Sequence, residues 1–165
     1  MNVRALEIAE RIRGEITELE RSVERSQRVW SRAARPSPDQ DMYIDAVALN
    51  LHSFYSGIER LLELIARHID RTVPTSETWH RDLLEQMAKN YGEIRPAVIS
   101  QSSALGLDEF RRFRHLVRNV YTTNLAPDKI DRLMSKLDRL WSQVRVELLA
   151  FAEFLEELGR EDTST

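Results

Sequence analysis

Residues 110–121 read Phe110-Arg111-Arg112-Phe113-Arg114-His115-Leu116-Val117-Arg118-Asn119-Val120-Tyr121, a segment whose apolar and cationic residues each recur at helical spacing. An α-helix turns by about 100° per residue, so residues three and four apart share a face. One face then carries the apolar side chains of Phe110, Phe113, Val117 and Val120. The other gathers Arg111, Arg114, Arg118 and Tyr121, with His115 and Asn119 on the adjoining flank. The segment therefore predicts an amphipathic helix with a core stripe and a cationic face.

The cationic face raises the question of what balances its charge. Guanidinium groups at this spacing repel one another unless an anion, such as a phosphate or a carboxylate, lies between them. The alternative is a solvated face whose arginines pair with Asp or Glu from other helices. With 24 basic and 27 acidic residues the net charge is −3, so the whole chain is not an electrostatic binder of nucleic acids. Any anion site must therefore be local.

Length and composition predict a single helical domain over residues 1–165. The apolar fraction is 42% and the charged fraction 31%, a balance typical of soluble helical proteins. The absence of cysteine excludes disulfides and thiolate chemistry, and it removes the best zinc ligands. The N-terminus is charged and the chain has no long apolar run, so we expect the protein to be neither secreted nor membrane-spanning. We therefore expect a cytoplasmic protein.

The first half of the chain predicts two long helices. Apolar residues at three- and four-residue steps indicate a helix over 3–34, which the prolines of segment 35–40 end. Asp41 is a plausible N-cap for the next helix, over 42–69. The apolar residues of this second helix are dense, so we expect it to lie centrally in the bundle.

The second half predicts a shorter helix over 77–91 after Ser76, and a loop with one helical turn over 92–103. Asp108 can cap the helix that contains the arginines, and Pro127 suits the first position of a long final helix. The sequence shows no strand pattern. The predicted fold is all-α, an up-and-down bundle of four main helices plus a shorter one.

The second half of the opening segment resembles the active-site motif of the HEPN superfamily, specifically of HepT-like toxins encoded beside a minimal nucleotidyltransferase antitoxin. That motif contains an arginine, a polar residue, several further residues, a histidine, any residue and a tyrosine, near the end of a helix. Arg114 matches the arginine, His115 the polar residue and Tyr121 the tyrosine. Asn119 stands where the motif has its histidine.

The resemblance extends beyond the motif. The helix segment 58–69 resembles the corresponding HepT-like helix, and residues 79–84 resemble a segment found in one branch of these proteins. It therefore covers most of the chain in architecture. Fold transfers through such a resemblance more readily than activity does.

The resemblance implies a homodimer whose subunits bring their motifs to a shared cleft and cut RNA without a metal or another cofactor. The implied RNA-binding residues are Arg111, Arg114 and Arg118, and the implied catalytic set is Arg114, His115, Arg118 and Asn119. Arginine suits a scissile phosphate, and histidine can move a proton near neutral pH. Because Asn119 cannot accept that proton, His115 is the candidate acid or base. Its alternatives are contact with RNA or no role at all.

Two further expectations concern partners. In the family the nucleotidyltransferase can modify the motif tyrosine with AMP, so Tyr121 is the candidate modification site, although ordinary packing competes with this role. The alternative function is a catalytically inactive HEPN-like binding or antitoxin subunit that pairs with a nucleotidyltransferase. In that case the replacement of the motif histidine by Asn119 reflects the loss of catalytic activity.

One Glu-x-x-His pair, Glu77 and His80, has the spacing of helical metal ligands. A carboxylate-bridged metal site in a bundle needs a second such pair, and neither His52 nor His68 provides it. We therefore expect a capping or surface role for the pair, and no metal.

Overall fold

The computed structural model describes residues 2–119 and 127–161, and the side chains of residues 3–114 and 127–161. These parts of the chain form helices and no strand, which confirms the all-α prediction of four main helices plus a shorter one. The helices are α1 (Asn2–Ala33), α2 (Gln40–Ile65) with a π-helical turn η1 (Ala66–Asp70), α3 (Trp79–Met87), α4 (Gln101–Asn119) and α5 (Pro127–Glu161). None of these described helices has an apolar stretch long enough to cross a membrane.

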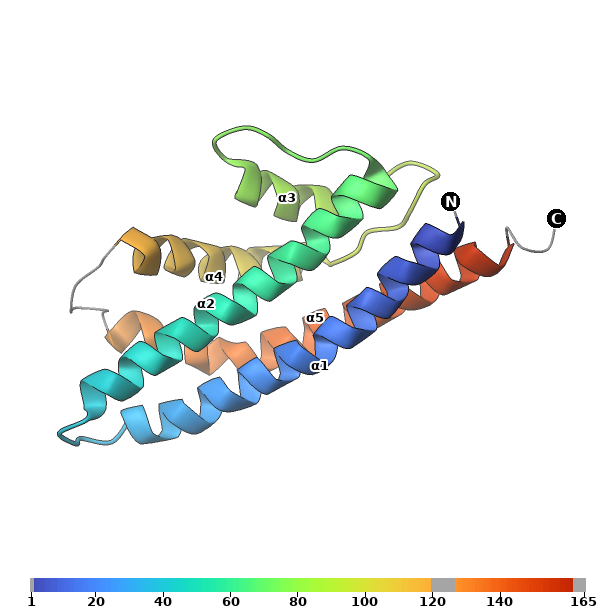
Figure 1. The fold of residues 1–165 in the computed structure, drawn as a ribbon. Helices are drawn as coiled ribbons and strands as arrows, with labels where there is room; N and C mark the ends of the chain where they lie inside the picture. The colour runs from blue at the N-terminus through green and yellow to red at the C-terminus, as the bar shows by residue number, and fades with distance from the viewer. Residues whose placement is uncertain (1, 120–126, 162–165) are drawn as a thin grey trace.

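The long helices pack lengthwise (Figure 1). Helix α1 packs along both α2 and α5, while α4 contacts α2, α3 and α5. Short α3 lies beside the C-terminal end of α2. Helix α2 thus touches every other helix of the bundle, which confirms its predicted central place. At Gly106 the backbone of α4 lies so close to Leu140 of α5 that a Cβ atom there would come within 2.7 Å of the leucine side chain.

The start of α4 differs from the prediction. The helix begins at Gln101, so the expected loop through residue 103 and the expected cap at Asp108 are both wrong. Ser100 performs the capping instead, because its Oγ accepts a hydrogen bond from the Ser103 amide at 3.1 Å. Glu147 of α5 accepts from the Ser100 amide at 3.1 Å and from the Ser103 hydroxyl at 2.7 Å. A carboxylate from a distant helix therefore fixes where α4 begins.

Two other helix starts also differ. Helix α2 begins at Gln40, so Asp41 lies inside its first turn, and Asp39 precedes it without a capping hydrogen bond from its side chain. Helix α3 begins at Trp79, two residues later than predicted, and Ser76 is not its N-cap. The hydroxyl of Ser76 instead donates to Asp82 Oδ2 at 2.7 Å. This contact joins the preceding loop to the first turn of α3.

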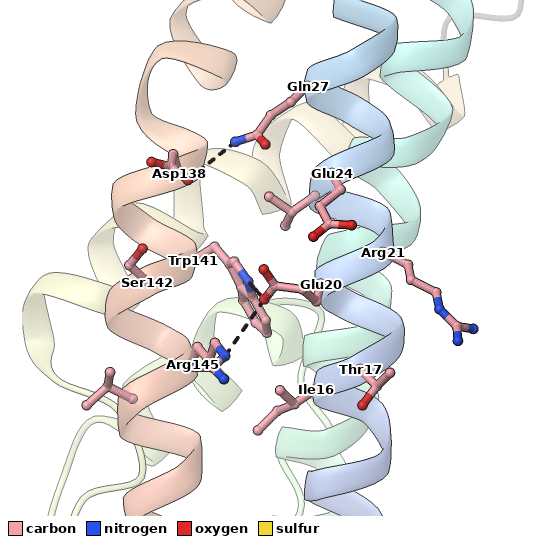
Figure 2. Close-up of a pocket in the computed structure, with 12 residues that line it drawn as sticks. Ile16, Thr17, Glu20, Arg21, Glu24, Gln27, Asp138, Trp141, Ser142 and Arg145 are labelled. Carbon is pink, nitrogen blue, oxygen red and sulfur yellow. Dashed lines mark hydrogen bonds and ion pairs between the residues drawn. The ribbon is translucent and has the colours of Figure 1, made fainter.

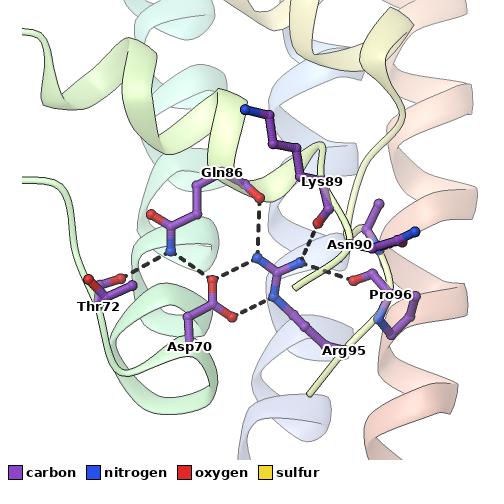
Figure 3. A network of polar contacts seen from close by, with 8 residues as sticks. Asp70, Thr72, Gln86, Lys89, Asn90, Arg95 and Pro96 are labelled. Atoms are coloured by element: carbon purple, nitrogen blue, oxygen red, sulfur yellow. Dashed lines mark hydrogen bonds and ion pairs between the residues drawn. The ribbon is translucent and has the colours of Figure 1, made fainter. Parts of the chain in front are cut away.

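Helix α3 ends at Met87 because the following chain is held by a buried ion pair (Figure 3). Asp70 at the end of η1 binds Arg95, and the Arg95 Nη2 to Asp70 Oδ2 distance is 2.6 Å. The same guanidinium donates to the carbonyls of Lys89, Pro96 and Gln86 at 3.0–3.2 Å. Both side chains of the pair are fully buried. This network fixes the α3–α4 connection against the end of α2.

Candidate functional site

Three helices meet at the carboxylate of Glu59, a buried residue of α2. The Nη1 atom of Arg114 on α4 donates to Glu59 Oε1 at 2.7 Å. The Nδ1 atom of His80 on α3 lies 2.7 Å from Glu59 Oε2. One carboxylate thus uses both of its oxygens, one for Arg114 and one for His80. We call Glu59, His80 and Arg114 the Glu59 cluster.

The sequence places these side chains through helical spacing. Arg114 lies one turn after Phe110, whose ring packs edge-on against Phe54 of α2 at 5.8 Å. That contact brings the arginine face of α4 alongside α2. On α3, the His80 ring stacks on the neighbouring Trp79 ring, with 3.6 Å between centroids. The Glu59 cluster is therefore built on helices, and packed aromatic rings orient it.

The cluster lies at the edge of the core. The Glu59 side chain is 7% exposed, whereas Arg114 is 19% and His80 29% exposed. The carboxylate is inside and its two partners reach solvent. Among the residues whose side chains the structure describes, Glu59 is the sole acceptor for the guanidinium of Arg114. Toward the described residues, the remaining N–H groups of that guanidinium have no hydrogen-bond acceptor.

Tyr55 lies one turn before Glu59 and borders the same carboxylate. Its hydroxyl is buried, without a well-directed hydrogen bond to the described residues. Burial, together with the nearby Glu59 carboxylate, raises the pKa of the Tyr55 phenol well above its ordinary value. The positive charges of Arg111 and Arg114 oppose this rise in pKa. The guanidinium of Arg114 lies over the Tyr55 ring, 6.0 Å from its centroid.

The predicted gathering of Arg111 and Arg114 is confirmed, but carboxylates of the chain partner them. The Arg111 Nε atom donates to Asp108 Oδ1 at 2.7 Å, and Arg114 binds Glu59. Pairing with Asp or Glu of another helix was the alternative to an anion ligand, and it applies to Arg114, whereas Arg111 pairs within its own helix. Asp108 therefore holds an arginine of its own helix rather than capping that helix.

Several predicted site residues lie outside the described part of the structure. The side chains of His115, Arg118 and Asn119 are in this group, as is Tyr121. The apolar stripe is confirmed as far as it is described, since Phe110 and Phe113 are buried. The remainder of that stripe, Val117 and Val120, is not described.

The sequence reasoning missed Glu59, Tyr55 and the place of His80. The expected capping or surface role for His80 is wrong, because the imidazole binds a buried carboxylate from α2. A signal for Glu59 was present: it is a charged residue among the apolar residues of the central helix, one turn from Tyr55. The described residues contain no group of three or more side chains suited to a metal ion.

A groove of about 500 Å³ runs between α1 and α5 (Figure 2). In it the Trp141 indole N–H donates to Glu20 Oε2, and Arg145 lies 3.7 Å from the same oxygen. No residue of the predicted site lines this groove. The Glu20 carboxylate is thus already paired with two neighbouring side chains of the groove.

The Glu59 cluster lies within the part of the chain that matches a protein-family model. A family model described as HepT-like protein matches residues 46–155, which include Glu59, His80 and Arg114. No curated protein and no solved structure match the chain. The match covers more than half of the sequence and confirms the resemblance drawn from the arginine segment. The chain belongs to the HepT-like family.

Proposed function

We propose that this HepT-like protein is a metal-independent endoribonuclease, the toxin of a toxin–antitoxin pair. The observation that carries the proposal is the geometry of Arg114, the motif arginine. Its guanidinium is held at 2.7 Å by a buried carboxylate, while its remaining N–H groups point to no other described acceptor. A fixed, partly exposed guanidinium suits a phosphate of RNA.

The proposed reaction is an internal transfer at a phosphodiester. The 2′-oxygen of the ribose forms a bond to phosphorus as its proton passes to a base, and the bond from phosphorus to the 5′-oxygen breaks. The departing 5′-oxygen takes a proton from water. The products are a 2′,3′-cyclic phosphate and a 5′-hydroxyl. Arg114 would stabilise the charge on the phosphate oxygens during this step.

The partners follow from the same proposal. Two chains would form a homodimer that brings both α4 motifs to one cleft, with Arg111 and Arg118 contributing to RNA binding. A nucleotidyltransferase antitoxin would neutralise the protein by attaching AMP to Tyr121. The added phosphate would place negative charge beside the arginines and compete with RNA.

A second function has its own support. Arg114 is already neutralised by Glu59, and Asn119 replaces the motif histidine. These two facts favour a non-catalytic subunit that binds a nucleotidyltransferase partner and does not cleave RNA. In that case the ion pair between Glu59 and Arg114 would stabilise the fold and would not bind RNA.

Induced expression of the chain in a bacterial host, with growth followed and total RNA searched for new 5′-hydroxyl ends, separates the two functions. The nuclease predicts growth arrest with new ends, both abolished by Arg114→Ala. Arg112→Ala is the matched control, because Arg112 is exposed on the same helix. Equal protein levels are verified for all variants. Intact RNA and normal growth with the unchanged chain, together with capture of a nucleotidyltransferase, would contradict the nuclease.

A further inference from the structure

His80 occupies a chemically distinctive place beside the motif arginine. Its Nδ1 atom and the Nη1 atom of Arg114 each lie 2.7 Å from a different oxygen of Glu59. A single buried carboxylate thus binds both an imidazole and a guanidinium, and these two side chains are partly exposed. A phosphodiester that reached the guanidinium would also lie near the imidazole.

The partner of Nδ1 determines the state of the ring. An ionised carboxylate only accepts hydrogen bonds, so the Nδ1 atom of His80 must donate its proton to Glu59. In a neutral imidazole this leaves the Nε2 atom with its lone pair, ready to accept a proton. Nε2 has no partner among the described residues, and the side chain is 29% exposed.

We propose that His80 is the proton acceptor of the RNA cleavage site and performs the role of the motif histidine that Asn119 replaces. This inference rests on the proposed endoribonuclease function. The Nε2 atom takes the proton of the 2′-hydroxyl while the 2′-oxygen bonds to phosphorus. It later returns that proton to water. Glu59 is a positioning residue, because it fixes the tautomer and the orientation of the ring.

Packing further restricts the His80 ring. Stacking on Trp79 at 3.6 Å holds one of its faces, and the hydrogen bond to Glu59 fixes its rotation. The first turn of α3 that carries the ring is joined to its preceding loop through Asp82 and Ser76. Proton transfer needs such an orientation, because the acceptor atom must lie within hydrogen-bond reach of the 2′-hydroxyl.

The test is single-turnover cleavage of a defined RNA oligonucleotide by the purified full chain. His80→Gln keeps a neutral side chain that can donate to Glu59 but cannot act as a base at neutral pH. We expect it to slow cleavage by about 10²–10⁴-fold. The control His68→Gln should stay within a few-fold of the unchanged chain. In His80→Gly, added imidazole should restore part of the lost rate, which a purely structural role would not allow.

A measurement on the unchanged chain covers the case in which the variants do not fold. The imidazole resonances of His80 are followed by NMR during titration with the same oligonucleotide carrying 2′-deoxyribose at the cleavage position. We expect the His80 Nε2 resonance to shift on binding. Binding that leaves this resonance unmoved overturns the proposal.

The outcomes separate this inference from the function on which it rests. If the unchanged chain cleaves RNA and His80→Gln cleaves equally fast, His80 is not the base and the nuclease function stands. If His115→Gln alone abolishes cleavage, the base is His115. If the unchanged chain neither binds nor cleaves RNA, the nuclease function fails and the role of His80 falls with it.

Discussion

The pairs Asp70–Arg95 and Glu59–Arg114 each join a buried carboxylate to an arginine, but they differ in how far the arginine is enclosed. Asp70 and Arg95 have no exposed side-chain surface, and backbone carbonyls accept the remaining N–H groups of Arg95. Arg114 is 19% exposed and gives Glu59 one hydrogen bond. In the Asp70–Arg95 pair, the closed pair, every N–H group of the arginine is already used, so none is left for a ligand. In the Glu59–Arg114 pair, the open pair, the partly exposed guanidinium keeps N–H groups that have no acceptor among the described residues.

Removing the charge of the closed pair should have the largest effect on stability. Asp70→Asn leaves the fully buried Arg95 guanidinium without a counter-charge. We expect the free energy of unfolding to fall by about 4 kcal/mol. Urea denaturation followed by circular dichroism measures this change. The control is Glu63→Gln, whose partner Arg67 is exposed, and its effect should stay below about 1 kcal/mol.

The same change at the open pair should cost less. Glu59→Gln turns one oxygen acceptor into a donor that faces His80 or Arg114, but both partners can turn toward water. We expect a loss of about 2 kcal/mol in the free energy of unfolding, roughly half of that for Asp70→Asn. If Glu59→Gln lowers the free energy of unfolding as much as Asp70→Asn does, the two pairs stabilise the fold equally.

Alkaline pH offers a probe of the interior beside the open pair. The pKa of Tyr55 is raised in the folded protein, chiefly by burial, so the unfolded chain loses this proton first, near pH 10. Below pH 10 the stabilisation is fully present, and above it stability falls by up to about 1.4 kcal/mol per pH unit. Urea midpoints between pH 9 and 11 should show this extra slope in the unchanged chain and not in Tyr55→Phe. Parallel curves would contradict it.

The smallest effect concerns the start of α3, which carries His80. The pKa of Asp82 is lowered, first by the hydrogen bond from the Ser76 hydroxyl. Its small stabilisation is therefore present above the ordinary carboxyl pKa and is lost as the pH falls through the lower folded value. Asp82→Asn should speed amide exchange in the first turn of α3 at pH 7 and leave the Asp70–Arg95 loop unchanged. Faster exchange in both places would mean that the two regions unfold together.

The sequence predicted the long helices well because their periodicity is local. The first helix was expected over 3–34 and spans Asn2–Ala33, and Pro127 begins α5 as expected. The start of α4 could not be predicted in this way, because Ser100 is held by Glu147, 47 residues away. Helix starts that depend on such distant contacts leave a weak local signal.

In the candidate site, too, the local features could be predicted and the contacts between distant residues could not. Helical spacing alone indicated that Arg111 and Arg114 share a face, and both residues lie within the continuous helix α4. Their partners depend on how the helices pack: Glu59 lies 55 positions from Arg114, and His80 lies 21 positions from Glu59. The sequence reasoning missed Glu59 although it is a charged residue among the buried apolar residues of α2, and its position in the sequence does not identify which cation it binds.

The central claim is that Arg114 of the open pair, Glu59–Arg114, binds RNA, whereas the closed pair, Asp70–Arg95, stabilises the fold. The most direct measurement is the RNA cleavage rate of purified Arg114→Lys, with its urea midpoint taken on the same sample. Lysine keeps the charge facing Glu59 but loses the planar set of donors that binds a phosphate. We predict that cleavage slows by about 10²-fold while the free energy of unfolding changes by less than about 1 kcal/mol. Cleavage at the unchanged rate, or a loss of stability comparable to that of Asp70→Asn, would contradict the account.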